Sequence, residues 1–341
     1  MEIGFLNLLA VLTSIAVSLA IVVPLSGVLV RFRANYNPKG LQLDAEGGAQ
    51  PYTGPIVQSY FGMLKRVYTI EVRVISAFMQ HIKYSHVEFT RSRDGTLSNC
   101  EVPTFLSTIF MTAIILLFID APRPTHGKYS APETGVIGTL VYSVILMFIS
   151  LPTAIITYRA ITTPLKLSWF NAARSLRALL TPTERRRPWI LYLTPGLLAA
   201  EISHIVIVVL GLGPIRRLLL PSLESGDADI SYIKLGIYIV ILILSTAVLT
   251  PLEVIATRLA IQRNHASSEY NSVSQEIEGD AEDAGEFAGT DEDVIGLRNE
   301  EDPYLGLVDC AKRIIDEEGW QALYRAWWIT LLGTFGSVVP Y

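Results

Sequence analysis

Six stretches of this chain are too apolar for the surface of a water-soluble domain. Four contain no charged residue over 18 to 28 positions, and a fifth contains only Glu201 and His204. Half of all residues are hydrophobic and 17% are charged, against about a quarter charged in soluble domains. A bilayer core requires about 17–25 apolar residues per helix. We therefore expect transmembrane helices over residues 3–30, 102–119, 134–158, 188–215, 235–252 and 327–341.

The connections between these runs alternate in length and in charge. Long connections follow the first, third and fifth runs, and basic residues outnumber acidic ones in the first two, residues 31–101 and 159–187. The short connections are near neutral. By the positive-inside rule the long connections share one side of the membrane. With six helices, both termini then lie on the other side.

The net charge of −5 combines two regions of opposite sign. Residues 264–302 hold 13 acidic residues and one basic residue, and the remainder carries 26 basic against 19 acidic residues, a balance of +7. Because its composition is small and polar, the acidic block is expected to be a disordered loop. We interpret it as a solvated insertion, with docking of a protein partner or of cations as the alternative.

Each long connection contains one amphipathic segment with apolar residues at helical spacing, over residues 56–81, 166–180 and 304–324. Such helices lie in the membrane interface with their basic faces toward anionic lipid head groups. The alternative is a cap packed on the ends of the helix bundle. Within the second connection, Thr181, Pro182 and Glu184 predict a helix start with threonine as the N-cap.

Three of the expected helices contain a proline that is followed seven residues later by an arginine. Seven residues are about two helical turns, so the two side chains share one face. A proline there frees a backbone carbonyl and kinks the helix. The recurrence predicts three pseudo-symmetric repeats, with the pairs Pro24 and Arg31, Pro152 and Arg159, and Pro251 and Arg258.

At these residues the chain resembles the mitochondrial carrier family, whose repeats each combine a kinked helix, an interfacial helix and a second helix. The third repeat matches the family signature best, through Pro251, Glu253, Arg258, Glu318-Gly319-Trp320 and Tyr324-Arg325. The resemblance implies an all-α membrane protein with six transmembrane helices in three pseudo-symmetric repeats and short interfacial helices. Its repeats would cover residues 1–125 (long loop 82–100), 126–222, and 223–341 with the disordered acidic insert 264–302.

The charged gate of the family is incomplete in this chain. In carriers, an acid two residues after the proline pairs with a base five residues after the proline of a neighbouring repeat. The acid positions hold Ser26, Ala154 and Glu253, and the base positions hold Leu29, Thr157 and Ala256. None of the three family pairs can form, so Arg31, Arg159 or Arg258 would have to substitute as the partner of Glu253.

The family's substrate-contact positions fall near small, uncharged residues, namely Ser107/Thr108, Ala199/Ala200 and Gly333/Thr334. They imply a small, neutral or unusual solute. Glu201 and His204 are ionisable at membrane depth and share one helix face, which makes them candidates for the substrate cavity and for pairing with each other. The other interpretation is a structural helix–helix hydrogen bond. Arg31, Arg159 and Arg258 are interpreted as snorkelling anchors rather than substrate ligands.

No motif of soluble catalysis is found: the sequence has no P-loop, dinucleotide-binding turn, HExxH or serine elbow. We therefore predict neither an enzyme nor a cofactor or metal site. Nucleic acid is not an expected partner, because the basic residues flank membrane segments.

Two functions remain. The first is transport of an unidentified solute across a mitochondrial membrane by alternating access. The family usually occupies the inner membrane, and anionic lipids such as cardiolipin would bind the basic interfacial helices. The alternative is a non-transporting adaptor of the outer mitochondrial membrane that acts in morphology, fusion or lipid handling. Loss of the gate pairs and the acidic loop favour this alternative.

Overall fold

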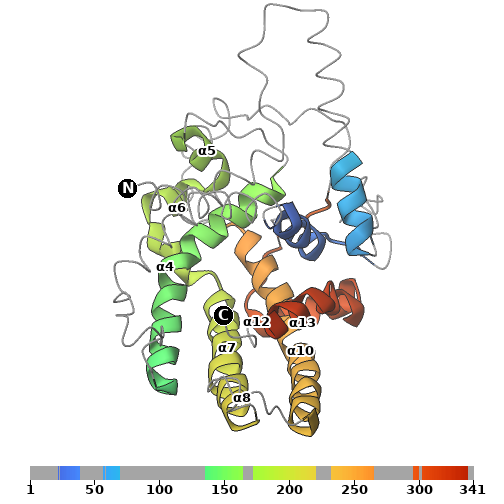
Figure 1. Cartoon of the computed structure of the whole chain (residues 1–341). Helices are drawn as coiled ribbons and strands as arrows, with labels where there is room; N and C mark the ends of the chain where they lie inside the picture. The colour runs from blue at the N-terminus through green and yellow to red at the C-terminus, as the bar shows by residue number, and fades with distance from the viewer. Residues whose placement is uncertain are drawn as a thin grey trace, which may run out of the picture.

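The computed structural model describes residues 22, 24–38, 57, 59–69, 135–163, 172–219, 232–264, 295–298 and 302–336 (Figure 1). These residues form helices and connecting segments, and none of them lies in a strand. Three helical segments within them are long and apolar enough to cross a membrane: Val136–Thr162, Leu197–Leu219 and Tyr232–Ile261.

These segments correspond to the third, fourth and fifth apolar runs of the sequence. The all-helical membrane class is confirmed for the described part of the chain. The second run, most of the first and the end of the sixth lie outside it. The arrangement of six spans in three repeats therefore stays a prediction, as do the repeat boundaries.

α4 (Val136–Thr162) and α10 (Tyr232–Ile261) each contain an internal proline, Pro152 and Pro251. Both helices continue through the proline, and α4 visibly changes direction along its length (Figure 1). α7 packs against both of them. A third helix with such a proline covers residues 24–34, where Pro24 begins the continuously described part.

The fourth span starts later than the sequence indicated. Residues 188–193, expected at its start, form the short 3₁₀-helix η1 (Pro188–Leu193), and the span begins at Leu197 after Gly196, whose φ is +81°. It runs through α7 (Leu197–Val206), the π-helical segment η2 (Ile207–Leu212) and α8 (Gly213–Leu219). In η2 the N–H of Gly213 bonds the carbonyl of Val208, five residues back. This wider turn precedes Pro214, which cannot donate the regular helical bond.

Short helices connect the spans, over residues 60–69, α5 (Ala172–Leu179), α6 (Pro182–Arg186), α12 (Leu307–Glu317) and η3 (Trp320–Tyr324), and α13 (Trp327–Gly336) follows η3. The predicted helix start at Thr181 is confirmed, because its side chain and Glu184 form a reciprocal capping box. α12 buries Cys310 and Ile314 against the span ends. The short helices thus form a cap, and their placement against lipid stays a prediction.

The tightly packed core lies at one end of the spans. Buried side chains of α4 concentrate between Ile155 and Thr162, and those of α10 between Val254 and Ala260. The opposite ends expose large apolar residues such as Ile137 and Ile233. Apolar exposure of this extent is expected where lipid replaces water.

Parts of the predicted disordered insert are packed, which corrects its limits. Ile295 is buried beside Phe32 and Met63, and Gly296 exchanges hydrogen bonds of 2.9 Å with the Asn35 side chain and the Tyr36 backbone N–H. Asn264 binds the Glu184 carboxylate. Composition alone does not predict these contacts, because the average over a strongly acidic segment does not show individual apolar or amide residues. Residues 265–294 lie outside the described residues.

Candidate functional site

The three signature arginines are buried at the packed ends of their helices, with exposed fractions of 5% for Arg31, 2% for Arg159 and 5% for Arg258. Their interpretation as snorkelling anchors is therefore wrong. Snorkelling keeps the charged head in water, whereas these guanidinium groups lie between helices. A buried guanidinium requires partners for its donors, and these partners define the site.

Each arginine donates its Nε–H to a backbone carbonyl of another kinked helix. Arg31 donates to Ile161 at 3.0 Å, Arg159 to Ala260 at 3.3 Å, and Arg258 to the carbonyl of Arg33 at 3.2 Å. Each acceptor lies two residues after the next signature arginine. The contacts thus run cyclically from 24–34 to α4, to α10, and back to 24–34. We call these three contacts the arginine ring.

Two of the arginines are also bound by buried carboxylates of the cap. Arg159 contacts both oxygens of Glu184 at 2.6 and 2.9 Å, and Arg258 contacts both oxygens of Glu318. Burial alone would raise the pKa of Glu184. The hydrogen bonds and charge of Arg159, with the backbone N–H groups of Asn264 and Thr181, outweigh burial and lower that pKa.

Glu318 binds a second guanidinium, that of Arg325, at 2.8 Å. Burial lowers the pKa of Arg325 to about 10, although the charge of Glu318 acts in the opposite direction. Arg258 and Arg325 also both donate to the carbonyl of Asn35. The end of helix 24–34 is thus held by two arginines of the third predicted repeat.

A second polar cluster surrounds Glu253, which lies five residues before Arg258 on α10. The Arg33 guanidinium donates to the Glu253 Oε2 at 2.5 Å, and the Thr330 hydroxyl donates to the same oxygen at 2.6 Å. The Arg33 guanidinium also donates to the Thr330 hydroxyl oxygen at 2.9 Å. His204 Nε2 lies 3.4 Å from Glu253 Oε1. We call Arg33, His204, Glu253 and Thr330 the Glu253 cluster. It joins helix 24–34, α7, α10 and α13.

The Glu253 cluster corrects the expected partner of its carboxylate. Arg33 binds Glu253, whereas Arg31, Arg159 and Arg258 are engaged in the arginine ring. The sequence offers one signal for Arg33, because it stands two residues after Arg31, where the other helices have Ile161 and Ala260. Of these three equivalent positions, only that of Arg33 holds a charged residue.

The other candidate residues are only partly brought together. Glu201 lies one turn before His204 on α7, and its charge acts on both His204 and Glu253. The first partner that the structure gives His204 is nevertheless Glu253 rather than Glu201. Thr334 lies one turn beyond Thr330 on α13 and donates to its carbonyl at 3.0 Å. Ser107 and Thr108 lie outside the described residues.

The prolines reveal one feature that sequence reasoning missed. A proline leaves the carbonyl four residues before it without its helical donor. The Tyr192 hydroxyl donates to the carbonyl freed by Pro152, that of Phe148, at 2.9 Å. The Tyr324 hydroxyl donates to the carbonyl freed by Pro251, that of Ala247, at 3.2 Å. The pattern is the same in both helices, and each kink is thereby tied to the cap.

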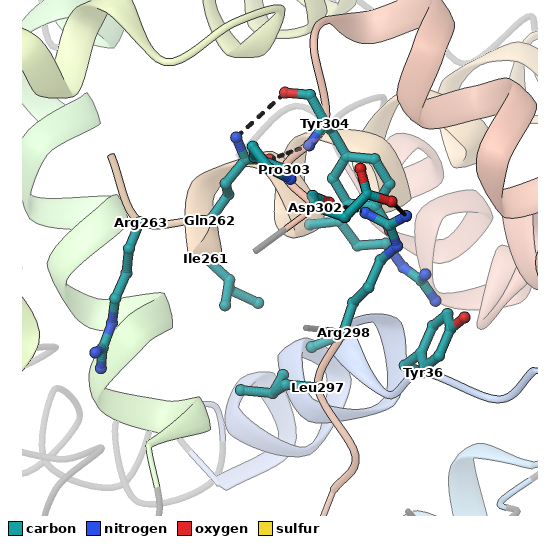
Figure 2. Close-up of a pocket in the computed structure, with 11 residues that line it drawn as sticks. Tyr36, Ile261, Gln262, Arg263, Leu297, Arg298, Asp302, Pro303 and Tyr304 are labelled. Atoms are coloured by element: carbon teal, nitrogen blue, oxygen red, sulfur yellow. Dashed lines mark hydrogen bonds and ion pairs between the residues drawn. The ribbon is translucent and has the colours of Figure 1, made fainter. Parts of the chain in front are cut away.

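A cavity of about 80 Å³ lies where α10 ends, beside the segments that flank the acidic insert (Figure 2). Gln262 and the backbone of Tyr304 exchange two hydrogen bonds across it, and the Arg298 guanidinium lies 4.8 Å from the centre of the Tyr304 ring. Arg298 also binds Asp302 and Glu317. Figure 2 shows Arg263 pointing away from this group. The cavity is smaller than typical small-molecule sites, and its walls chiefly fix the chain on both sides of the insert.

Metal chemistry has no support in the described residues, which bring no three His, Cys, Asp or Glu side chains together as ligands. Burial raises the pKa of the Cys310 thiol to about 12, so the thiol is protonated at neutral pH. This agrees with an ordinary reduced cysteine. What the site offers instead is a set of buried charge contacts that hold kinked helices together.

Kinked apolar spans joined at one end by buried arginines define a polytopic helical membrane protein with a closed, polar helix junction. Residues 239–340 match the family model described as mitochondrial carrier protein. The match covers 102 of the 341 residues and lies within the third predicted repeat, so this segment is similar to that family. No curated protein matches the chain.

Proposed function

We propose that this protein carries a small solute across a mitochondrial membrane by alternating access, with the arginine ring and the Glu253 cluster closing one end of the path. The observation that carries the proposal is the cyclic set of contacts among helix 24–34, α4 and α10. Helices that are tied at one end can separate there and close at the other end. The family match supports the direction of this reasoning.

The Glu253 cluster supplies a closing contact in place of the missing family pairs. A carboxylate that accepts from Arg33 and Thr330 joins α10 to two other helices. Hydrogen bonds to charged groups contribute about 1.5–3 kcal/mol each. The contact therefore favours the closed end by an amount that binding of a solute could overcome.

The solute is proposed to be small and uncharged or of unusual chemistry. Ser107, Thr108 and Thr334 stand at family contact positions, and no arginine stands among them. The inner mitochondrial membrane is proposed from the family's usual location. Anionic lipids such as cardiolipin are proposed partners of the basic cap helices.

The adaptor function remains the second candidate, supported by the anchoring of the acidic insert. Its first residue, Asn264, binds Glu184, and the chain returns at Ile295 and Gly296 against the end of helix 24–34. The described residues on both sides of the insert thus lie against the cap. An acidic segment presented there would suit a basic protein partner at the outer mitochondrial membrane.

Reconstitution into liposomes tests the proposal. Wild type, Glu253→Gln and the control Glu317→Gln would be assayed for uptake of a panel of metabolites, with protein-free liposomes as background. We expect uptake of at least one solute by wild type and by the control, and altered uptake by Glu253→Gln. If the folded wild type moves no solute of a broad panel, transport is refuted and the adaptor function gains support.

A further inference from the structure

The Glu253 cluster and its neighbour Glu201 contain an odd number of formal charges. Glu201 and Glu253 are carboxylates, and Arg33 is the guanidinium in direct contact with Glu253. His204 is 3.4 Å from Glu253, and its charge acts on Glu201 as well. With a neutral imidazole the four side chains sum to one negative charge. One additional proton brings the sum to zero.

A net charge at this depth is unfavourable. A charged residue without a compensating partner is costly within a membrane span even on insertion scales. Glu201, His204 and Glu253 all belong to spans, on α7 and α10. A bound proton would remove this net charge when the end closes.

Among the described residues, the other charged side chains on the surrounding helices are bound to other groups and do not balance this net charge. From α4, Tyr158 is the titratable side chain whose interactions reach Glu201, Arg33 and Glu253. Arg159 and Arg258 lie further along α4 and α10, where Glu184 and Glu318 bind them. Arg31 is directed to the carbonyl of Ile161. From α13, Thr330 contributes a hydroxyl without charge.

The side chains of both His204 and Glu253 are partly exposed, whereas the His204 Nε2 atom itself is buried and has no hydrogen-bond partner among the described residues. The side chains of His204 and Glu253 are 31% and 25% exposed, in contrast to 0% for Glu184, which binds Arg159. Their separation of 3.4 Å exceeds a normal hydrogen bond, so a proton can arrive or leave without breaking a tight pair. Histidine is the side chain best suited to exchange a proton near neutral pH.

We infer that Glu201, His204 and Glu253 form a proton-binding site, and that one proton is carried with the solute in each transport cycle. This inference rests on the proposed transport function. The proton comes from hydronium on the side to which the path is open, and a new N–H bond forms at His204 or a new O–H bond at Glu201. After the path opens to the other side, the same bond breaks and the proton returns to water there. No electron transfer is involved.

The coupling follows from the charge balance. When the group is protonated, it is neutral and the closed end can form around the Glu253 contact. When it is deprotonated, a net negative charge would have to be buried as the end closes, so the helices stay apart. The protonated, solute-loaded form therefore closes this end, and loss of the proton on the other side lets the empty protein reopen it.

The test uses full-length protein in liposomes that contain an entrapped pH-sensitive dye. The variants are His204→Gln, Glu201→Gln and the matched control Ser203→Ala on the same helix. A solute that wild type takes up should acidify the lumen. A gradient of one pH unit should accumulate that solute about tenfold at one proton per solute. Ser203→Ala should behave as wild type. Glu201→Gln makes the group neutral without a bound proton and should lose acidification and accumulation, whereas His204→Gln keeps one net negative charge and should lower uptake.

Solute uptake by wild type with no proton movement and no accumulation would overturn the proton site and leave transport intact. If wild type takes up no solute, the proton site is tested in purified protein by thermal unfolding between about pH 5 and 8, the range in which histidine titrates. The difference between wild type and His204→Gln should then change with pH, and that between wild type and Ser203→Ala should not. Parallel curves for all variants would refute the site.

Discussion

Glu184→Gln tests the buried junction between the second and third predicted repeats. The Glu184 carboxylate accepts hydrogen bonds from Arg159, Asn264 and the Thr181 backbone, and its residue is 1% exposed. Glutamine removes the negative charge and turns an N–H₂ group toward donors. Breaking a buried ion pair in this way costs about 3–5 kcal/mol. We expect the free energy of unfolding to fall by that amount.

The assay is thermal unfolding in a Cys100→Ala background followed with a thiol-reactive dye, since Cys310 is fully buried until the cap opens. Glu317→Gln is the control, because its pair with Arg298 is partly exposed and should contribute no more than about 1 kcal/mol. A loss below about 1 kcal/mol for Glu184→Gln would refute our account of the junction.

The same variant predicts a pH dependence. The pKa of Glu184 is lowered in the folded protein from its usual 4.5, by the Arg159 contacts that outweigh burial. A depressed pKa adds stability that is fully present above the unfolded value and is lost as pH falls through the folded value. Wild type should therefore lose part of its advantage over Glu184→Gln below about pH 4.5. An advantage that does not decline under acid would contradict this assignment.

Three further predictions concern the cap. Gly196→Ala should cost at least about 1–3 kcal/mol, because φ is +81° and an added Cβ would lie 2.2 Å from the backbone of Leu307; thermal unfolding unchanged from wild type would contradict it. Tyr192→Phe and Tyr324→Phe should each lower the free energy of unfolding in lipid nanodiscs by about 1–3 kcal/mol, since each leaves a proline-freed carbonyl without its donor. No change in either variant would show that these hydrogen bonds are dispensable. Replacing residues 265–294 with a neutral linker of equal length should leave the unfolding temperature unchanged. A lower unfolding temperature would show that the acidic block itself contributes packing.

The features that sequence reasoning found are those that depend on neighbours along the chain. The capping box of Thr181 and Glu184 is a local motif, and the proline–arginine pairs follow from helical spacing. The signature arginines were located correctly but given the wrong environment, because their burial depends on carbonyls more than 100 residues away, as for Arg159 and Ala260 at 101 residues.

The parts that could not be predicted depend on tertiary contacts. Arg33 is separated from Glu253 by 220 residues, and nothing in its local sequence names that partner. The anchoring of Ile295 was hidden because one apolar residue in an acidic stretch carries no periodic signal. Its environment of Phe32 and Met63 arises only when the cap assembles on helix 24–34.

The central claim is that the tied helix ends close a transport path and reopen. Thr157 is a buried residue of α4 at a family gate position, so a cysteine there reports opening in a chain whose Cys100 and Cys310 are replaced by alanine. The measurement is its rate of reaction with a membrane-impermeant thiol reagent in liposomes. The account predicts slow reaction in the resting protein, and faster reaction when Glu253→Gln is added or a transported solute is present. The same slow rate under all three conditions would contradict the account.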